Sequence, residues 1–355
     1  MRGYPILVAF IAGIIGGGVF TLLHLPLSWL LCSMVSVFLI NKWTNFELAW
    51  PSYLRDLGLI IVGYTIGQSF SRKTMIEIFT QLPSMLTTTV TLIVFSMILA
   101  YITSEMTGIG LPSTITGSIP GGLSQMVALG EEMKTIDLTV VTILQVIRLL
   151  SVIFVVPFLV FSPLLAGERT DSGVAAQSLE LPGIQWGFVL FFTIAITAGF
   201  LAEKIHLPTP GLLGPILVIG GFMVAEWPVP HMPGLLIILA QLSLGIYFSF
   251  MMNFSSSEGM GKFIIWSLFT SLCLLLCCTG LSVLLSRWHD ITFLTAFISL
   301  APGGMAEMAL VGQAVDADLS IITGYHLFRI LFILFVIPVL LKVLFNFSIF
   351  QKGRH

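Results

Sequence analysis

Long apolar stretches without an acidic or basic residue constrain this chain more than any other feature of its sequence. Residues 3–41 contain no Asp, Glu, Lys or Arg, and a helix needs roughly 20 apolar residues to cross a hydrocarbon core about 30 Å thick. Of the 355 residues, 57% are hydrophobic and 9% are charged, whereas roughly a quarter of a soluble domain is charged. The runs are continuous and do not alternate, which excludes an outer-membrane barrel. The sequence therefore predicts an all-α polytopic membrane protein.

Helices are predicted where apolar stretches lie between charged or turn-forming residues. In the first half of the chain they cover residues 5–22, 27–40, 57–71, 83–103, 109–132 and 138–161. Arg72, Lys73 and Glu77 fall in a short connection between two of these helices.

Distinctive residues of the first half return in the second half at a nearly constant offset. His24-Leu25-Pro26 returns as His206-Leu207-Pro208, and Arg148 returns as Arg329 with an offset smaller by one position. A fixed offset over most of a chain indicates internal duplication. The predicted organisation is a first membrane repeat, a polar linker, a second membrane repeat and a C-terminal tail, at residues 1–161, 162–182, 183–342 and 343–355. Each repeat is expected to hold five or six transmembrane helices.

A Pro-Gly-Gly sequence recurs with the same offset as the His-Leu-Pro sequence, as Pro120-Gly121-Gly122 and Pro302-Gly303-Gly304. Proline lacks a backbone donor and glycine relaxes the backbone, so neither sequence fits the interior of a plain helix. Each is predicted to break a helix, which either crosses the membrane or re-enters it. The N-terminus of the following half-helix would then favour an anion. Close crossing of neighbouring helices is the alternative explanation.

The behaviour of these segments also decides the orientation of the repeats. Re-entrant segments give five crossings in each repeat and inverted halves, and spanning segments give six crossings and parallel halves. Lys and Arg concentrate on the cytoplasmic side of membrane proteins. Their distribution here favours the inverted arrangement weakly.

Gln125 and Glu307 occupy the same position after the two Pro-Gly-Gly sequences. A carboxyl group inside a membrane is costly unless it faces a cavity or a partner, so Glu307 is a candidate for proton or cation coupling. Stabilisation by the helix dipole is the alternative role for this carboxylate. Because Gln125 is neutral, the two halves are expected to differ in function.

Arg148 and Arg329 each lie eleven residues after an aspartate, Asp137 or Asp318. That spacing corresponds to about 16 Å along a helix and places both arginines near the middle of the membrane. Two roles are open: the arginines bind the carboxylate of a solute, or they cap carbonyl groups left free by the breaks. His326 lies three residues before Arg329 and is a candidate titrating group for coupling.

Several function classes have no support in the sequence. The formal net charge is -2 and no run of Lys or Arg suggests nucleic-acid binding. The six histidines are scattered, no nucleophile motif or phosphate loop occurs, and the four cysteines lie in apolar stretches. We therefore expect no enzymatic activity, no catalytic residue, no metal and no cofactor. The expected partners are the lipid bilayer of the cytoplasmic membrane and a small-molecule solute, and a homodimer is compatible with the sequence.

The duplicated Pro-Gly-Gly sequences, each followed by an arginine, and the sequence Ala301-Pro302-Gly303-Gly304-Met305-Ala306-Glu307-Met308 resemble the membrane-embedded AbrB family. The resemblance covers nearly all of both halves. It implies a duplicated membrane region with an acidic residue after each Pro-Gly-Gly, and Gln125 departs from that pattern. The plan of two repeats with broken helices is also similar to the cation/proton antiporter and anion transporter superfamily, which implies an architecture and not a substrate.

Three functions follow as hypotheses. The first is a secondary transporter of a small anionic solute, coupled to protons or cations. The second is a membrane sensor that acts indirectly on gene expression, as the regulator label of the family implies. The third and most distant is a membrane oxidoreductase, because family members are also labelled ammonia monooxygenases.

Overall fold

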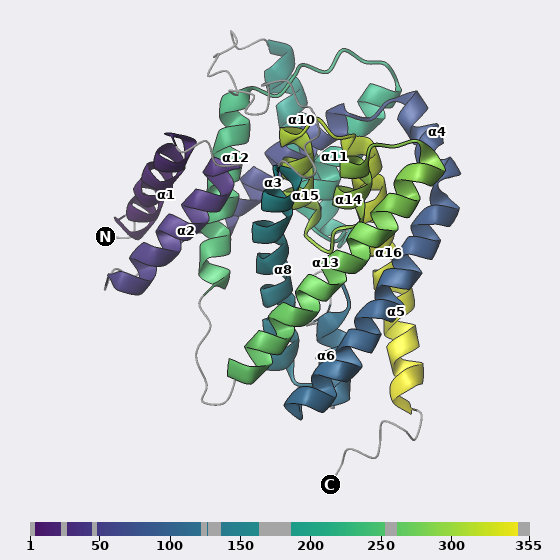
Figure 1. Ribbon diagram of the computed structural model, residues 1–355. Helices are drawn as coiled ribbons and strands as arrows, with labels where there is room; N and C mark the ends of the chain where they lie inside the picture. Colours follow the sequence, from purple (N-terminus) through teal and green to yellow (C-terminus); the bar gives the residue numbers. More distant parts are fainter. Residues whose placement is uncertain are drawn as a thin grey trace. The chain divides into compact units, whose positions relative to one another are not determined.

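The computed structural model describes residues 4–22, 27–44, 48–121, 126, 136–162, 186–252 and 261–346 (Figure 1). The secondary structure of these residues is helical, which confirms the predicted all-α fold for the described part of the chain. The helices are α1 (Tyr4–Leu22), α2 (Ser28–Trp43), α3 (Ser52–Gln68), α4 (Arg72–Thr80), α5 (Leu82–Thr107), α6 (Leu111–Ser118), α8 (Leu138–Val160), α10 (Trp186–Lys204), α11 (Pro210–Val224), α12 (Gly234–Met251), α13 (Gly261–His289), α14 (Phe293–Leu300), α15 (Met305–Ala314) and α16 (Leu319–Asn346).

Six of the described helices contain stretches long and apolar enough to cross a membrane. They are Leu82–Thr107, Leu138–Val160, Gly187–Lys204, Gly234–Met251, Gly261–His289 and Leu319–Leu341, and shorter apolar helices occupy Pro5–Val19, Ser28–Trp43 and Pro210–Val224. Large apolar side chains on these helices are exposed in the isolated chain, including Ile265 at 67%, Leu276 at 71% and Phe335 at 70%. Lipid tails would cover such side chains, so the chain is a multi-pass membrane protein.

Two segments differ from the sequence prediction. Arg72–Thr80 forms helix α4, where a connection was predicted. The Ser71 hydroxyl accepts a hydrogen bond from the Thr74 backbone N–H, and the Ser71 N–H donates to the Thr74 hydroxyl, so the first turn is capped reciprocally. Helix α3 begins at Ser52, ahead of the predicted start at residue 57.

The helices form two compact units, each drawn from both halves of the sequence. Unit 1 comprises Met1–Phe79, Pro157–Asn253 and Ala306–Ile321, and unit 2 comprises Thr80–Val156, Phe254–Met305 and Ile322–His355. The predicted repeat boundaries are therefore not the boundaries of the compact units.

Gly63 and Gly245 lie at close helix crossings of unit 1. Helix α3 packs against α11, and helix α12 packs against α2. A Cβ added to Gly63 in α3 would lie 2.5 Å from the carbonyl oxygen of Leu212, and one added to Gly245 in α12 would overlap the carbonyl oxygen of Leu30. Gly63 and Gly245 are equivalent positions of the two predicted repeats. At both positions the neighbouring backbone leaves no space for a larger side chain.

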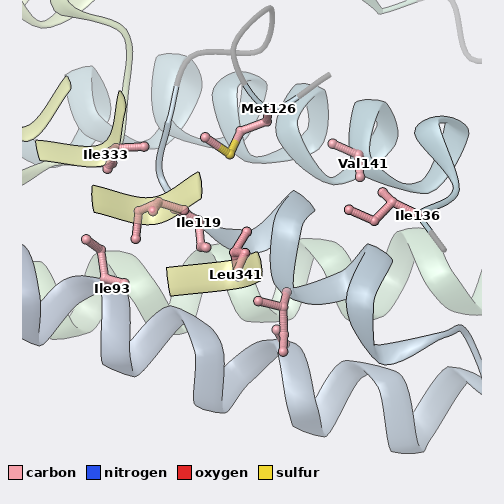
Figure 2. Packing of buried hydrophobic residues seen from close by; sticks show 10 residues of the cluster. Ile93, Ile119, Met126, Ile136, Val141, Ile333 and Leu341 are labelled. Carbon is pink, nitrogen blue, oxygen red and sulfur yellow. The ribbon is translucent and has the colours of Figure 1, made fainter. Parts of the chain in front are cut away.

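Unit 2 is built on two long helices, α5 and α13, which run side by side (Figure 1). Helix α6 packs on α5, and helix α14 packs on α13. A buried apolar cluster joins α5, α6, α8 and α16 to the segment after α6 (Figure 2). Its members include Ile119 and Met126, which flank the first Pro-Gly-Gly sequence, and Ile333 of α16, and all three are at most 1% exposed. The cluster therefore fixes the end of α6 against α16.

We predict that Gly63→Ala and Gly245→Ala each destabilise the protein by about 1–3 kcal/mol, because the added methyl group meets a backbone carbonyl that cannot move aside. Gly280→Ala in α13 is the matched control, since a Cβ there meets nothing within 4 Å. Thermal unfolding of the purified protein in detergent would measure the three variants. A Gly63→Ala protein as stable as Gly280→Ala would contradict the prediction.

Candidate functional site

Both Pro-Gly-Gly sequences lie directly after a short helix of unit 2. We name residues 119–122 the first Pro-Gly-Gly segment, of which 119–121 are described, and residues 301–304 the second Pro-Gly-Gly segment. Helix α6 ends at Ser118 and α14 ends at Leu300. The next residues, Ile119 and Ala301, are extended, with ψ of 129° and 134°. Both precede proline, which disfavours helical backbone at the preceding residue and so ends each helix at that point.

Aspartate caps begin the two helices that carry the arginines. The Asp137 Oδ1 atom accepts hydrogen bonds from the N–H groups of Thr139 and Val140 at the start of α8. The Asp318 Oδ1 atom accepts from the N–H groups of Ser320 and Ile321 at the start of α16. These caps fix where each helix begins, and therefore which turn carries the arginine.

Arg148 of α8 is 8% exposed and donates to the carbonyl groups of the first segment. Its Nη1 atom lies 2.9 Å from the carbonyl oxygen of Ile119 and 3.5 Å from that of Ser118. Its Nη2 atom lies 3.2 Å from the carbonyl oxygen of Gly121 and 2.6 Å from Gln145 Oε1. The guanidinium therefore satisfies backbone acceptors left free where α6 ends.

Arg329 of α16 is 4% exposed and repeats this arrangement at the second segment. Its Nη1 atom donates to the carbonyl oxygens of Ala301 at 2.9 Å and Leu300 at 3.3 Å. Its Nη2 atom donates to the carbonyl oxygen of Gly303 at 3.2 Å and to His326 Nδ1 at 2.8 Å. Of the two roles predicted for the arginines, these contacts are those of the carbonyl-capping role.

A donor count shows what remains of each guanidinium. Arginine has five N–H groups, and four of them on Arg148 and on Arg329 are used by the contacts described above. The Nε–H of each arginine is buried and has no hydrogen-bond partner among the described residues. The ion pairs of the described residues are Arg55–Asp56 and Lys73–Glu77, so neither buried arginine faces a carboxylate there. Each arginine thus has no counter-ion and one N–H without a hydrogen-bond partner among the described residues.

Gln145 and His326 are both hydrogen-bonded to the arginine of their own half and to a backbone carbonyl oxygen. The two carbonyls are not equivalent positions, because Ile119 corresponds to Ala301 and His326 contacts Ile298. The Gln145 side chain donates from Nε2 to the carbonyl oxygen of Ile119 and accepts from Arg148 through Oε1. His326 Nε2 lies 3.0 Å from the carbonyl oxygen of Ile298, which can only accept, and Nδ1 lies next to an arginine, which can only donate. The imidazole is therefore neutral, with its proton on Nε2. This geometry gives His326 a positioning role, and its predicted role in coupling stays a prediction.

Glu307 lies in the first turn of α15, after the second segment, and belongs to unit 1. The residue is 7% exposed, and its Oε2 atom has no hydrogen-bond partner among the described residues. A carboxylate is favoured at the N-terminus of a helix. Burial opposes the charged form, so these two effects act on the carboxyl group in opposite directions.

The other predicted residues divide into two groups. Pro120, Gly121, Pro302, Gly303 and Gly304 are described, and Gly121 and Gly303 supply carbonyl oxygens to the arginines. A Cβ on Gly121 would lie 2.8 Å from Met126 Cε and 3.1 Å from Ile333 Cγ2, so a larger residue there requires these side chains to shift. Gly122 and Gln125 lie outside the described residues. In the part of the chain that the structure describes, no three His, Cys, Asp or Glu side chains gather as a metal site requires.

A small cavity of unit 2 lies beside Arg148. The cavity has a volume of ≈ 20 Å³. Its lining residues are Ser96, Leu99, Gly117, Ser118, Leu144, Arg148, Ser267, Thr270, Ser271 and Leu274. This space is large enough for a water-sized group. The hydroxyl group of Ser271 is buried there without a partner among the described residues. Apart from Arg148, these residues were not predicted from the sequence, because single serines in apolar helices are common.

Cys278 of α13 supplies a further contact to the second segment that was not predicted. Its Sγ atom donates to the carbonyl oxygen of Leu300 at 3.3 Å. The four cysteines are free, and Cys278 is fully buried. This thiol thus satisfies a backbone acceptor in addition to packing between helices.

The apolar helices and the paired, arginine-capped segments place this chain in the class of multi-pass helical membrane proteins. The sequence model of the family described as "Transition state regulatory protein AbrB" matches residues 5–345. The chain belongs to this family, which confirms the resemblance found in the sequence.

Two relatives illustrate the range of the family. An uncharacterized protein of Bacillus subtilis (strain 168), YhjN, is 24% identical over 317 residues, which are 84% of this chain and 80% of the relative. A protein of Escherichia coli (strain K12) is 22% identical over 333 residues, 93% of each chain, and its name gives it provisionally as the regulator AbrB.

We predict that His326→Gln keeps the stability of the protein and that His326→Ala lowers it by about 1–3 kcal/mol. Glutamine can accept from Arg329 and donate to a carbonyl oxygen of the second half, as Gln145 accepts from Arg148 and donates to Ile119 in the first half. Alanine leaves Arg329 and the carbonyl oxygen of Ile298 without this partner. Thermal unfolding at pH 6 and pH 8 would compare the variants. Gln145→Ala is the matched control and should resemble His326→Ala. Equal losses in His326→Gln and His326→Ala would contradict the shared role.

Proposed function

We propose that this chain is a secondary transporter of a small anionic solute, and that its site lies at the two Pro-Gly-Gly segments. The observation that carries the proposal is the pair of buried arginines whose charge meets no carboxylate among the described residues. A buried charge without a counter-ion is costly. A bound anion would relieve this cost.

We further propose that the site is assembled from two related halves. The first residues of α1 and α10, Tyr4 and Trp186, are separated by the same offset as the two Pro-Gly-Gly sequences. Helices α6 and α14 both begin and end with this offset. The contacts of Arg148 and Arg329 follow the relationship donor by donor. These correspondences support two repeats, each with a helix broken at its Pro-Gly-Gly segment, as many transporters have.

Glu307 is the proposed coupling group. It is a buried carboxyl group with one oxygen atom free of partners in the described part of the chain, and its first-half equivalent, Gln125, cannot titrate. Binding and release of a proton at Glu307 would change the charge next to the N-terminus of α15. The proposal therefore assigns coupling to the second half.

A sensor that acts indirectly on gene expression is the second candidate, favoured by the regulator name of the Escherichia coli relative. Such a protein would bind an anion without carrying it across the bilayer. Measuring binding and flux on the same preparation separates the two functions. We place either function in the cytoplasmic membrane.

We predict that the purified chain in liposomes carries a radiolabelled anion from a panel of small organic acids. Arg148→Ala and Arg329→Ala should each reduce this flux at least tenfold, because each removes a positive charge and frees three backbone carbonyls. Arg287→Ala is the control and should keep the flux, because Arg287 is exposed at the end of α13. Size-exclusion profiles would establish that each variant is folded. Absence of flux for the whole panel would contradict transport, and binding without flux would favour the sensor.

We predict that flux in the unmodified protein responds to an imposed pH gradient and that Glu307→Gln abolishes this response. Glutamine keeps the shape of the side chain and cannot bind or release a proton at these pH values. Glu307→Asp keeps a carboxyl group and should retain part of the response. The initial rates with and without the gradient measure the effect. A Glu307→Gln protein with the full response would exclude Glu307 from coupling.

A further inference from the structure

The two arginines have the same partners but different surroundings. The cavity described above lies beside Arg148, and a role for it in binding rests on the proposed transport function. Around Arg329 the corresponding positions hold larger side chains. At the offset of the two prolines, Gly117 corresponds to Ser299 and Ser118 to Leu300. At the offset of the two arginines, Leu144 corresponds to Tyr325.

The helices α5 and α13 differ in the same direction. Ser96, which lines the cavity, corresponds to Cys278, and Ser267 corresponds to Met85. Cys278 is fully buried and Met85 is 1% exposed. The larger side chains at the Arg329 side would fill the volume that stays open beside Arg148.

Two fully buried donors without a partner among the described residues remain in the lining of this cavity. The hydroxyl groups of Ser96, Ser267 and Thr270 each donate to a carbonyl oxygen of their own helix. Ser271 Oγ and Arg148 Nε have no partner among the described residues, and their residues are 4% and 8% exposed. A buried donor without an acceptor is unfavourable. A ligand that brings acceptor atoms and a negative charge would satisfy both donors.

We propose that the cavity beside Arg148 binds a single carboxylate group of the solute. Beside Arg329 the Nε–H and the Tyr325 hydroxyl are also buried without partners among the described residues, but larger side chains occupy the equivalent positions, and we assign this arginine a structural role. The fork of the guanidinium is occupied by Ile119, Gly121 and Gln145, so the carboxylate contacts Arg148 through Nε–H alone and takes its second hydrogen bond from Ser271. Leu99, Leu144 and Leu274 form the apolar walls of this cavity. In this proposal Arg148 contacts the carboxylate, whereas Arg329 only holds the backbone of the second segment in place.

The test measures the thermal stability of the full chain in detergent against sodium formate and sodium acetate, with sodium chloride at the same ionic strength as the reference. Sodium nitrate, which is planar and monovalent, tests an inorganic source of the same shape. Formate and acetate should stabilise the unmodified protein. Ser271→Ala should raise the apparent dissociation constant about tenfold, because a hydrogen bond to a charged group is lost. Thr89→Ala, at the position of the other repeat that corresponds to Ser271, should leave it unchanged.

A second variant, Ser118→Leu, places in the first half the side chain that the second half carries at Leu300. It should abolish stabilisation by both carboxylates while the protein remains folded. Equal effects of Ser271→Ala and Thr89→Ala, unchanged binding in Ser118→Leu, or stabilisation by nitrate alone would each overturn the inference. If the liposomes still carried an anion in that case, the proposed transport function would stand without it. Absence of both binding and flux would overturn both.

Discussion

The hydrogen bonds between two buried guanidinium groups and the carbonyl oxygens of the Pro-Gly-Gly segments are the interactions on which the rest of unit 2 depends. A proline ends α6 and α14 inside an apolar protein, where the freed carbonyl groups have no water to bind. One arginine at each segment satisfies three of these carbonyls at once. The helices that carry the arginines are held in turn by their aspartate caps. Without the guanidinium, no other described side chain donates hydrogen bonds to all three carbonyl oxygens at the end of the short helix.

That arrangement also explains why the arginines are poor candidates for a bidentate grip on a solute. Four of the five N–H groups of each arginine already donate to protein acceptors. The positive charge can still attract an anion, but the two parallel N–H groups needed for a bidentate contact are occupied. A neutral side chain three residues before each arginine, Gln145 or His326, accepts its remaining Nη2 hydrogen bond. An amide and a neutral imidazole can both accept a hydrogen bond from the arginine and donate one to a backbone carbonyl oxygen.

The positions of the arginines and the ends of the short helices could be predicted from the sequence, whereas the cavity and helix α4 could not. The spacing from Asp137 to Arg148 placed the arginine at the level of the first segment, and Pro120 predicted where α6 ends. The choice between solute binding and carbonyl capping could not be made, because both roles keep Arg148 in the same place. The cavity was missed because it depends on α5, α6, α8 and α13 meeting in space, and no local pattern around Ser271 encodes that. Helix α4 was not predicted because its charged residues were taken as a connection, and the capping hydrogen bonds between Ser71 and Thr74 were not recognised in the sequence.

The glycine crossings of unit 1 have a consequence for how the protein is made. Helix α3 packs against α11, and helix α2 packs against α12. Both partner helices belong to the second half of the chain and are synthesised later. During biosynthesis the early helices therefore enter the bilayer with their closest packing surfaces, at Gly63 and around Leu30, still facing lipid. Unit 1 also contains Ala306–Ile321, so it is complete only after Ile321 has been synthesised. The order of the helices thus leaves α2 and α3 without these packing partners until the second half of the chain is made.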